Sequence, residues 1–235
     1  MKARRIEAAI VDLDGTLVDT LGDFELALNL TLAEFALSPV DRAFIADTLG
    51  KGSEHLLRAT LARAGGDAAL YDAAWAHYQR HYRAVNGRHA PVYPGARAGL
   101  ERLRAAGLPL ACVSNKPHEF AAALLERKGL DGYFAQVFGG ASFERRKPAP
   151  LPLLRAAAAL GSLPERTLVI GDSANDAIAA RAAGCPLVLV SYGYNHGEPV
   201  ARVGADALVD RIDAIDLDAF SAGLQARCVG AQVGS

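Results

Sequence analysis

The sequence has no excess of charge of either sign, few cysteines and no long hydrophobic run. Its 25 lysines and arginines nearly balance 26 aspartates and glutamates, so the formal net charge is −1 over 235 residues. Such a chain has no overall basic character of the kind that binds nucleic acid. No apolar stretch approaches the roughly 20 residues that a membrane-spanning helix needs. We therefore expect neither nucleic acid nor membrane as a partner, although a few local cations can still bind a small anion.

Disulfide and zinc frameworks are also disfavoured. The three cysteines (Cys112, Cys185 and Cys228) are odd in number, widely spaced and without a CxxC pair. Cys112 and Cys185 lie in or beside apolar runs, where a buried free thiol is the ordinary state. The N-terminus is basic, but Asp12 follows too soon for the apolar core of a signal peptide. These features indicate a cytoplasmic protein.

Short apolar runs separated by helical segments predict an α/β fold. The expected strands are residues 8–11, 108–113, 136–138, 167–170, 187–190 and 207–209. The expected helices between them are residues 96–106, 117–128, 149–160 and 175–183, with Gly107, Gly129, Gly161 and Gly184 just past their ends. The runs are continuous rather than alternating, which is typical of strands covered on both faces. We therefore predict a Rossmann-like open parallel sheet with helices on both faces.

Residues 20–90 contain no convincing strand and several helical patterns. Leu21, Leu28 and Leu32 share one helical face, and residues 71–85 form another helical stretch. Loops are expected at residues 19–22 and 86–95. We interpret this block as a helical cap domain inserted into an α/β core made of residues 1–19 and 91–235. The tail after about residue 222 is expected to be frayed.

Two carboxylates stand directly after the first expected strand. Asp12 and Asp14 are spaced i, i+2 and project to the same side of the chain. At about 4 Å, like charges repel by about 4 kcal/mol at an effective dielectric constant of 20, so stability alone does not favour this pair. Either a metal ion keeps one carboxylate ionised, or one is protonated. An ordinary Asp-Gly turn is the non-functional alternative.

Polar groups follow three other predicted elements. Ser114 and Asn115 stand at a strand-to-helix turn, where Pro117 is expected to start the helix, and they form either an anion site or a plain N-cap. Lys147 comes before prolines that fix its backbone, or belongs to a solvated run of charges. Asp172 ends an apolar strand, and Asp176 completes either a functional acidic pair or a capping box. Each group taken alone is a weak signal.

Taken together, the four groups predict one site. The carboxyl ends of parallel strands meet at the same edge of an open sheet, where ligands bind. Acids for a hard cation, hydrogen-bond donors for an anion and one fixed lysine are suited to Mg²⁺ and phosphate.

The order of these motifs resembles the haloacid dehalogenase-like hydrolase superfamily. In chain order the motifs are Asp12-x-Asp14-x-Thr16, Ser114, Lys147-Pro148 and Gly171-Asp172-x-x-x-Asp176. Within the superfamily the sequence is most similar to the phosphoglycolate phosphatases, through the stretches VDLDGTLVDT (11–20), VSNKP (113–117), GDSAND (171–176) and YGYNHGEP (192–199). The resemblance implies the α/β fold with a helical cap and Mg²⁺-dependent hydrolysis of a small phosphate ester, 2-phosphoglycolate above others.

The resemblance also implies a role for each matching residue. Asp12 would attack phosphorus to form an aspartyl-phosphate, and Asp14 would protonate the leaving alcohol and then activate water. Mg²⁺ would be bound by Asp12, the backbone carbonyl of Asp14 and Asp172. The remaining matched residues would bind phosphate, orient the loops or support the site: Thr16, Ser114, Asn115, Lys147, Gly171 and Asp176.

The cap would choose the substrate, and here the likeness is weaker. Lys51, between Gly50 and Gly52, is proposed to meet the far end of the substrate; the alternative is a solvated lysine on a turn. The stretch from Tyr192 to Pro199 positions the cap or a neighbouring subunit, or is a packed surface loop. The sequence leaves monomer and homodimer open.

Several other functions share parts of the pattern. They are a phosphatase or pyrophosphatase for another small ester, a β-phosphoglucomutase-like sugar phosphomutase, and a phospho-acceptor signalling domain. A halide-releasing dehalogenase is disfavoured because a halide leaving group does not need a proton from Asp14. Signalling domains of this kind lack a helical insertion, and Asp14 gives the chain a means to hydrolyse its own phospho-aspartate.

Overall fold

A computed structural model describes residues 5–222, and Cys228 and the tail beyond residue 222 lie outside this range. Six strands form one parallel sheet in the order β3-β2-β1-β4-β5-β6. The strands are β1 (Ala8–Val11), β2 (Leu110–Val113), β3 (Gln136–Phe138), β4 (Thr167–Gly171), β5 (Leu187–Val190) and β6 (Ala207–Val209). The order runs outward in both directions from β1, so the fold is the Rossmann-like α/β arrangement that the sequence predicts.

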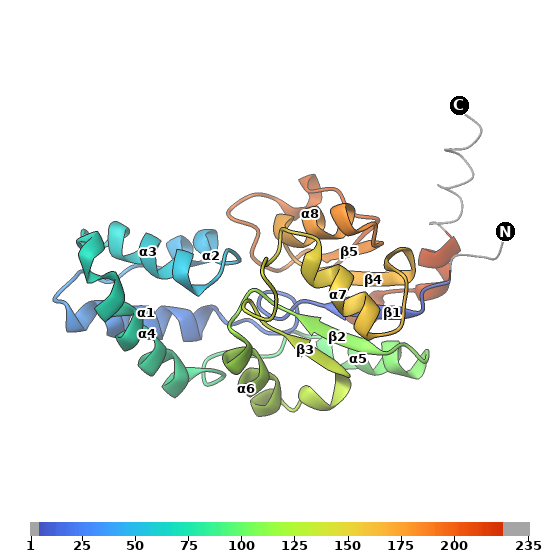
Figure 1. Cartoon of the computed structure of the whole chain (residues 1–235), viewed down its shortest axis with the longest axis horizontal. Helices are drawn as coiled ribbons and strands as arrows, with labels where there is room; N and C mark the ends of the chain where they lie inside the picture. The colour runs from blue at the N-terminus through green and yellow to red at the C-terminus, as the bar shows by residue number, and fades with distance from the viewer. Residues whose placement is uncertain (1–4, 223–235) are drawn as a thin grey trace.

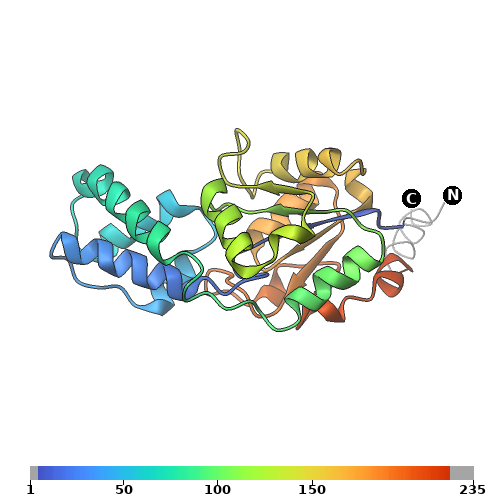
Figure 2. The same ribbon diagram turned by 90° about the horizontal axis from the view of Figure 1, so that it is seen from below.

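Helices cover both faces of the sheet (Figures 1 and 2). They are α5 (Ala96–Ala105), α6 (His118–Lys128), α7 (Leu151–Ala159) and α8 (Ala174–Ala183). Successive residues of a strand belong to two separate apolar clusters, one on each face of the sheet. Val11 packs with α5 and α6, and Ile10 packs with α7 and α8. This two-sided burial explains why the strand sequences are continuously apolar.

The helices between Leu21 and Val85 pack around a third apolar cluster, at the left of Figure 1. They are α1 (Leu21–Glu34), α2 (Arg42–Thr48), α3 (Ser53–Arg63) and α4 (Tyr71–Val85). Their largest buried side chains include Tyr78 and Tyr82 of α4. Phe120 of α6 joins the same cluster and so connects these helices to the sheet.

Short 3₁₀ turns complete the described chain. They are Ala68–Leu70, Asp131–Tyr133, Pro164–Arg166, Val200–Arg202 and Ile212–Ala214. Within residues 5–222, none of the helices has the length and apolar character needed to cross a membrane. Cys112 and Cys185 are buried free thiols, as expected from their apolar surroundings.

Helix ends follow the predicted pattern closely. The four glycines expected to end helices all have positive φ, between 61° and 82°. The predicted start at Pro117 is wrong by one residue: α6 begins at His118, and Pro117 has an extended ψ of 138°. Likewise β2 begins at Leu110 rather than 108, after Pro109, which has no N–H to donate to a neighbouring strand.

The predicted loop at residues 19–22 is only half correct. α1 begins at Leu21, so Leu21 and Gly22 are helical. Gly22 reflects close packing instead of a turn, because a Cβ there would lie 2.5 Å from the carbonyl oxygen of His89. The start of α1 therefore lies directly against the segment that returns the chain to the sheet.

Candidate active site

The strand register places the polar residues that follow β1, β2 and β4 at the same edge of the sheet. Val11 is the partner of Cys112 on β2 and of Ile170 on β4. Because parallel strands run in the same direction, the residues that follow them emerge side by side. Asp12, Ser114 and Asp172 all line a cleft between the sheet and the α1–α4 helices, with about 540 Å³ of empty space including space open to solvent.

Asp12 lies at the end of the central strand, with its side chain 12% exposed. Its Oδ1 forms an ion pair with Nζ of Lys147 at 2.8 Å. Burial raises the pKa of Asp12 to about 7, and Lys147 opposes this shift only in part, because Asp176 and Asp14 raise the pKa further. Near neutral pH this carboxyl group therefore exchanges readily between its protonated and ionised forms.

Lys147 is buried and held by three oxygen atoms. Its Nζ donates to the carbonyl of Val113 at 2.8 Å and to Oδ1 of Asp176 at 2.7 Å, in addition to pairing with Asp12. Burial lowers the pKa of Lys147, but the charges of Asp12 and Asp176 raise it by more, so the pKa stands above its ordinary value. Lys147 is thus a buried cation whose position is fixed by three oxygen atoms.

Asp172 is almost fully buried beside the first loop. Oδ1 accepts a hydrogen bond from the hydroxyl of Thr16 at 3.1 Å, and Oδ2 accepts one from the backbone N–H of Tyr194 at 2.6 Å. A Cβ on Gly15, whose φ is +85°, would lie 2.1 Å from Oδ2 of Asp172. Only glycine therefore lets the loop that carries Asp14 pass so close to this carboxylate.

Asp176 has its oxygens occupied by protein donors. Oδ2 accepts from the N–H and the hydroxyl of Ser173 in the predicted capping box, and Oδ1 accepts from Lys147. Its capping and functional interpretations are therefore compatible, because the same carboxylate caps α8 and fixes the lysine. Gly171, the last residue of β4, lies against Asp176: a Cβ there would be 2.4 Å from the carboxyl carbon.

The carboxylates exceed the cations at this point of the cleft. Oxygens of Asp12, Asp172 and Asp176 lie within 4.8 Å of one another, and Lys147 is the ammonium group among them. Burial, followed by the charges of Asp176 and Asp12, raises the pKa of Asp172 well above its ordinary value. One ammonium cannot neutralise three acids, and an all-oxygen donor set suits a hard divalent cation. Asp176 pairs with the ammonium of Lys147, whereas Asp172 accepts hydrogen bonds from uncharged donors only, so Asp172 and the second oxygen of Asp12 are better placed to bind such a cation.

Asp14 forms an ion pair that the sequence analysis did not predict. Nζ of Lys116 lies 2.8 Å from Oδ1 of Asp14, and it also donates to the hydroxyl of Tyr82 at 2.6 Å. The same ammonium lies over the ring of Phe24, 4.5 Å from its centroid. Ser114 completes the surroundings, with its hydroxyl 3.4 Å from Oδ2 of Asp14. Lys116 therefore connects the candidate acid to two aromatic residues of the α1–α4 helices.

Asn115 connects the two sides of the cleft through backbone carbonyls. Its Nδ2 donates to the carbonyls of Gly50 and Lys147, both at 2.8 Å. Asn175 of α8 donates to the same Gly50 carbonyl at 3.2 Å. Lys51, the next residue, is exposed and is not among the residues that line the cleft. Contact between Lys51 and a substrate stays a prediction.

The stretch from Tyr192 to Pro199 connects the cleft to the start of α1. The hydroxyl of Tyr192 donates to the carbonyl of Thr16 at 2.8 Å, and that of Tyr194 bonds to Asp19 and lies 3.3 Å from the N–H of Leu21. Its His196 lies 3.2 Å from the carbonyl of Asp47 in α2. This stretch therefore packs within the chain, between the loop that follows β1 and the α1–α4 helices.

Comparison with known proteins gives consistent results. The family model described as haloacid dehalogenase-like hydrolase matches residues 6–184. The chain is 41% identical over 207 residues to the phosphoglycolate phosphatase of Thiobacillus denitrificans, covering 87% of this chain and 91% of that protein. It is 42% identical over 210 residues to the plasmid phosphoglycolate phosphatase of Cupriavidus necator, covering 88% and 90%. A crystal structure of a predicted phosphoglycolate phosphatase from Haemophilus somnus superposes with a TM-score of 0.86 at 29% identity, covering 91% of this chain and 97% of that one.

Proposed function

Because the chain belongs to the haloacid dehalogenase-like hydrolase family and is a phosphatase, we propose that it hydrolyses 2-phosphoglycolate with Mg²⁺ through a phosphorylated Asp12. Relatives named phosphoglycolate phosphatase match nearly the whole length of the chain, which supports the choice of substrate. The observation that carries the chemistry is the position of Asp12, a largely buried carboxylate that lines the cleft, paired with Lys147 and close to Asp172.

Asp12 is the proposed nucleophile because its geometry leaves one oxygen available. Oδ1 is held by Lys147, so we assign the attack on phosphorus to Oδ2. The ammonium of Lys147 also stabilises negative charge on the transferring oxygens, together with the hydroxyl of Ser114 and the N–H of Asn115. The result is a phosphoryl group on Asp12 and a departing alkoxide that needs a proton.

Asp14 is the proposed source of that proton. It lines the cleft two residues from Asp12, and Lys116 stabilises the carboxylate that is left after the proton has moved to the alkoxide. The same carboxylate can then take a proton from the water that attacks the phosphoryl-aspartate. In this proposal Lys116 is a positioning residue that fixes Asp14 when the cleft is closed.

Asp12, Asp172 and the backbone carbonyl of Asp14 are the groups that we propose bind Mg²⁺. When bound, Mg²⁺ neutralises charge on the phosphate and so reduces its repulsion of the attacking carboxylate. The excess of carboxylates over ammonium groups at this point supports the assignment.

Mg²⁺ binding is expected to strengthen between pH 6 and pH 8. The pKa of Asp12 is raised to about 7, so in the metal-free protein the proton stabilises the folded state below that pH and this contribution is lost as the pH rises through 7. At pH 6 Mg²⁺ has to displace the proton, which weakens apparent affinity about tenfold relative to pH 8. Thermal denaturation with increasing Mg²⁺ at both pH values measures this. Equal affinity at pH 6 and pH 8 contradicts the assignment of Asp12 as a ligand, and Asp12→Asn is the control that removes this carboxyl group while leaving Asp172, whose pKa is also raised.

Residues 20–90 are proposed to act as a cap that closes over the substrate. The Gly50 carbonyl, held by Asn115 and Asn175, and the Lys116–Tyr82 hydrogen bond are contacts that join this segment to the sheet. Because all of them cross the cleft, opening the cap has to break them. The closed cleft suits a small ester, and it limits the access of bulk water while the phosphoryl group is transferred to Asp12.

A phosphate-release screen tests the substrate assignment. With Mg²⁺ present, we expect 2-phosphoglycolate to give the highest kcat/KM among small phosphate esters and pyrophosphate, without any bisphosphate primer. Asp12→Asn, prepared in parallel, controls for contaminating phosphatases. Phosphate transfer between sugar hydroxyls that depends on a sugar bisphosphate would instead identify a phosphomutase. A stable phospho-aspartate without turnover would identify a phospho-acceptor domain.

A further inference from the structure

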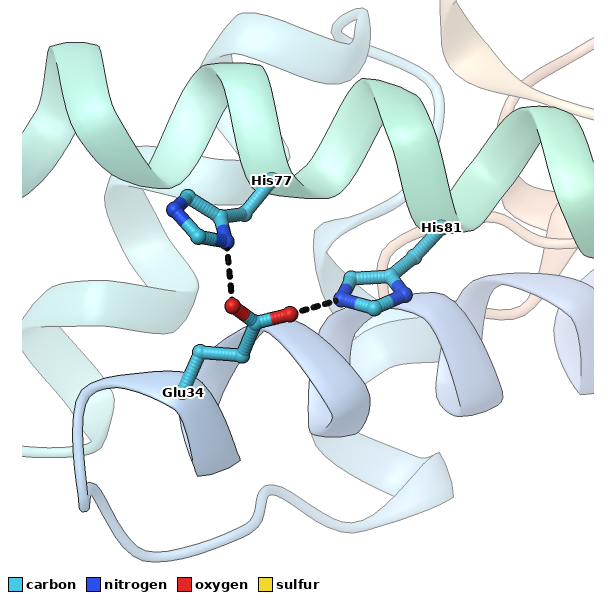
Figure 3. A group of neighbouring side chains, drawn as sticks. All are labelled: Glu34, His77 and His81. Carbon is cyan, nitrogen blue, oxygen red and sulfur yellow. Dashed lines mark hydrogen bonds and ion pairs between the residues drawn. The ribbon is translucent and has the colours of Figure 1, made fainter.

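A second group of metal-ligating side chains lies on the α1–α4 helices, away from the cleft. Among residues 5–222, two groups of three His, Cys, Asp or Glu residues have ligand atoms within 4.8 Å of one another. One is the acidic group in the cleft, and the other is Glu34, His77 and His81, shown in Figure 3. We propose that Glu34, His77 and His81 form a binding site for a divalent transition-metal ion, with Zn²⁺ as the best match.

The geometry of the cluster supports this proposal. His77 and His81 are one helical turn apart on α4 and present their rings to the carboxylate of Glu34 at the end of α1 (Figure 3). Nδ1 of His77 is 2.5 Å from Oε2 of Glu34, and Nε2 of His81 is 2.7 Å from Oε1. Phe35 contacts the His77 ring edge-on, with the centroids 5.3 Å apart, which restricts its orientation.

The donor types distinguish this site from the cleft. Two imidazole nitrogens and one carboxylate oxygen suit Zn²⁺ and its neighbours in the first transition series, whereas Mg²⁺ prefers oxygen ligands alone. Three protein ligands leave a fourth tetrahedral position for water. The side chains of Glu34, His77 and His81 are only partly exposed, at 34%, 31% and 19%, so an ion from solvent can reach them.

Arg80 contacts two of the three proposed ligands in this structure. Its Nη2 lies 2.5 Å from Oε1 of Glu34 and 3.0 Å from Nδ1 of His77. The Arg80 side chain is 59% exposed, so it can turn into solvent when a metal ion replaces its charge. Arg80 therefore competes with the metal for Glu34.

A metal ion at this position would join α1, which lines the cleft through Phe24, to α4. Glu34 belongs to the helix that carries Phe24, and His81 precedes Tyr82, whose hydroxyl accepts from Lys116. Cross-linking α1 to α4 stabilises the folded state by mass action, because the unfolded chain does not hold the three ligands together. We therefore expect Zn²⁺ to raise the Tm, and this readout does not depend on phosphatase activity.

Zn²⁺ titration in the presence of saturating Mg²⁺ tests the site, with calorimetry and thermal denaturation as readouts. The excess Mg²⁺ occupies the oxygen ligands of the cleft. For wild type we expect one Zn²⁺ site and a rise in Tm. His77→Ala, His81→Ala and Glu34→Gln should each weaken binding at least about tenfold. His118→Ala, which removes an exposed histidine outside the cluster, should leave binding unchanged.

Arg80→Ala is expected to change the Zn²⁺ affinity in the opposite direction. Removing the competing guanidinium should strengthen Zn²⁺ binding several-fold, whereas binding through unrelated histidines would not respond. Co²⁺ is a spectroscopic probe, because its visible absorption should show mixed nitrogen and oxygen ligands and should disappear in His81→Ala. The proposal is overturned if Zn²⁺ binding survives unchanged in both histidine variants, or if Arg80→Ala weakens it. Phosphate release with Mg²⁺ in the same variants separates this result from any failure of the proposed phosphatase mechanism.

Discussion

Replacing Asp12 with asparagine is expected to lower kcat by more than about 10⁴-fold while the protein remains folded. An amide of nearly the same shape has no anionic oxygen with which to attack phosphorus, so the covalent route is lost. The fold should tolerate the change, because the raised pKa of Asp12 already reflects a site that favours the neutral form. Lys147 keeps two of its three oxygen partners, Asp176 and the carbonyl of Val113.

Two measurements distinguish a lost nucleophile from a damaged protein. Steady-state phosphate release gives kcat, and thermal denaturation of the metal-free protein at pH 8 gives stability. At that pH wild-type Asp12 is ionised in a site that disfavours its charge, so the variant should be no less stable than wild type. Turnover within about tenfold of wild type would exclude Asp12 as the nucleophile. A Tm far below wild type would instead show that Asp12 is needed for the fold.

Most of the sheet could be predicted because strands that are buried on both faces have continuously apolar sequences. The runs at 8–11, 136–138, 187–190 and 207–209 coincide with β1, β3, β5 and β6. The less accurate predictions concern prolines and glycines, because the same residue type occurs in more than one structural context. Gly22 is a case in point: the same lack of a Cβ that permits a turn permits the contact of α1 with His89.

The acidic half of the site could be predicted because strand ends fix it. Asp12 and Asp172 follow neighbouring strands directly, so their proximity depends only on sheet order. The prolines that follow Lys147 predict a fixed backbone, and the buried contacts of its ammonium group agree with a fixed position.

The contacts across the cleft could not be predicted in the same way. Lys116 stands in the VSNKP stretch, yet its sequence position does not reveal that a helix some thirty residues earlier supplies Tyr82 as its partner. The role of Gly50 is equally hidden, because its carbonyl, rather than a side chain, accepts from Asn115 and Asn175. Both depend on how the α1–α4 helices dock against the sheet, which periodicity alone does not determine.

These contacts join the proposed cap to Asp14, the proposed acid. Lys116 pairs with Asp14 on one side and with Tyr82 and Phe24 on the other. If the proposed cap opens, the ammonium would lose its aromatic neighbours and gain water, which would weaken its ion pair with Asp14. We infer that Asp14 has a fixed orientation chiefly when the cleft is closed, which restricts proton transfer to bound substrate.

Replacing Asp14 with asparagine should stall the reaction after phosphoryl transfer. The variant keeps Asp12 and Lys147, so some phosphorylation should proceed, but no carboxylate remains to take a proton from the attacking water. We expect kcat to fall by about 10²–10⁴-fold and the phosphorylated protein to accumulate. Rapid quenching followed by intact-mass measurement detects the covalent phosphoryl group, and its decay gives the hydrolysis rate.

The Lys116 ion pair adds a second effect that has to be separated from catalysis. Asp14→Asn leaves a buried ammonium without its carboxylate, at a cost to stability on the order of 3 kcal/mol. Lys116→Met in the same protein removes the unpaired charge, so the double variant should recover stability without recovering turnover. If turnover returns with stability, Asp14 serves to hold Lys116 and the proposed proton transfer is wrong. If stability returns while the phosphorylated protein still accumulates, the defect lies in hydrolysis of the phosphoryl-aspartate, which is the step assigned to Asp14.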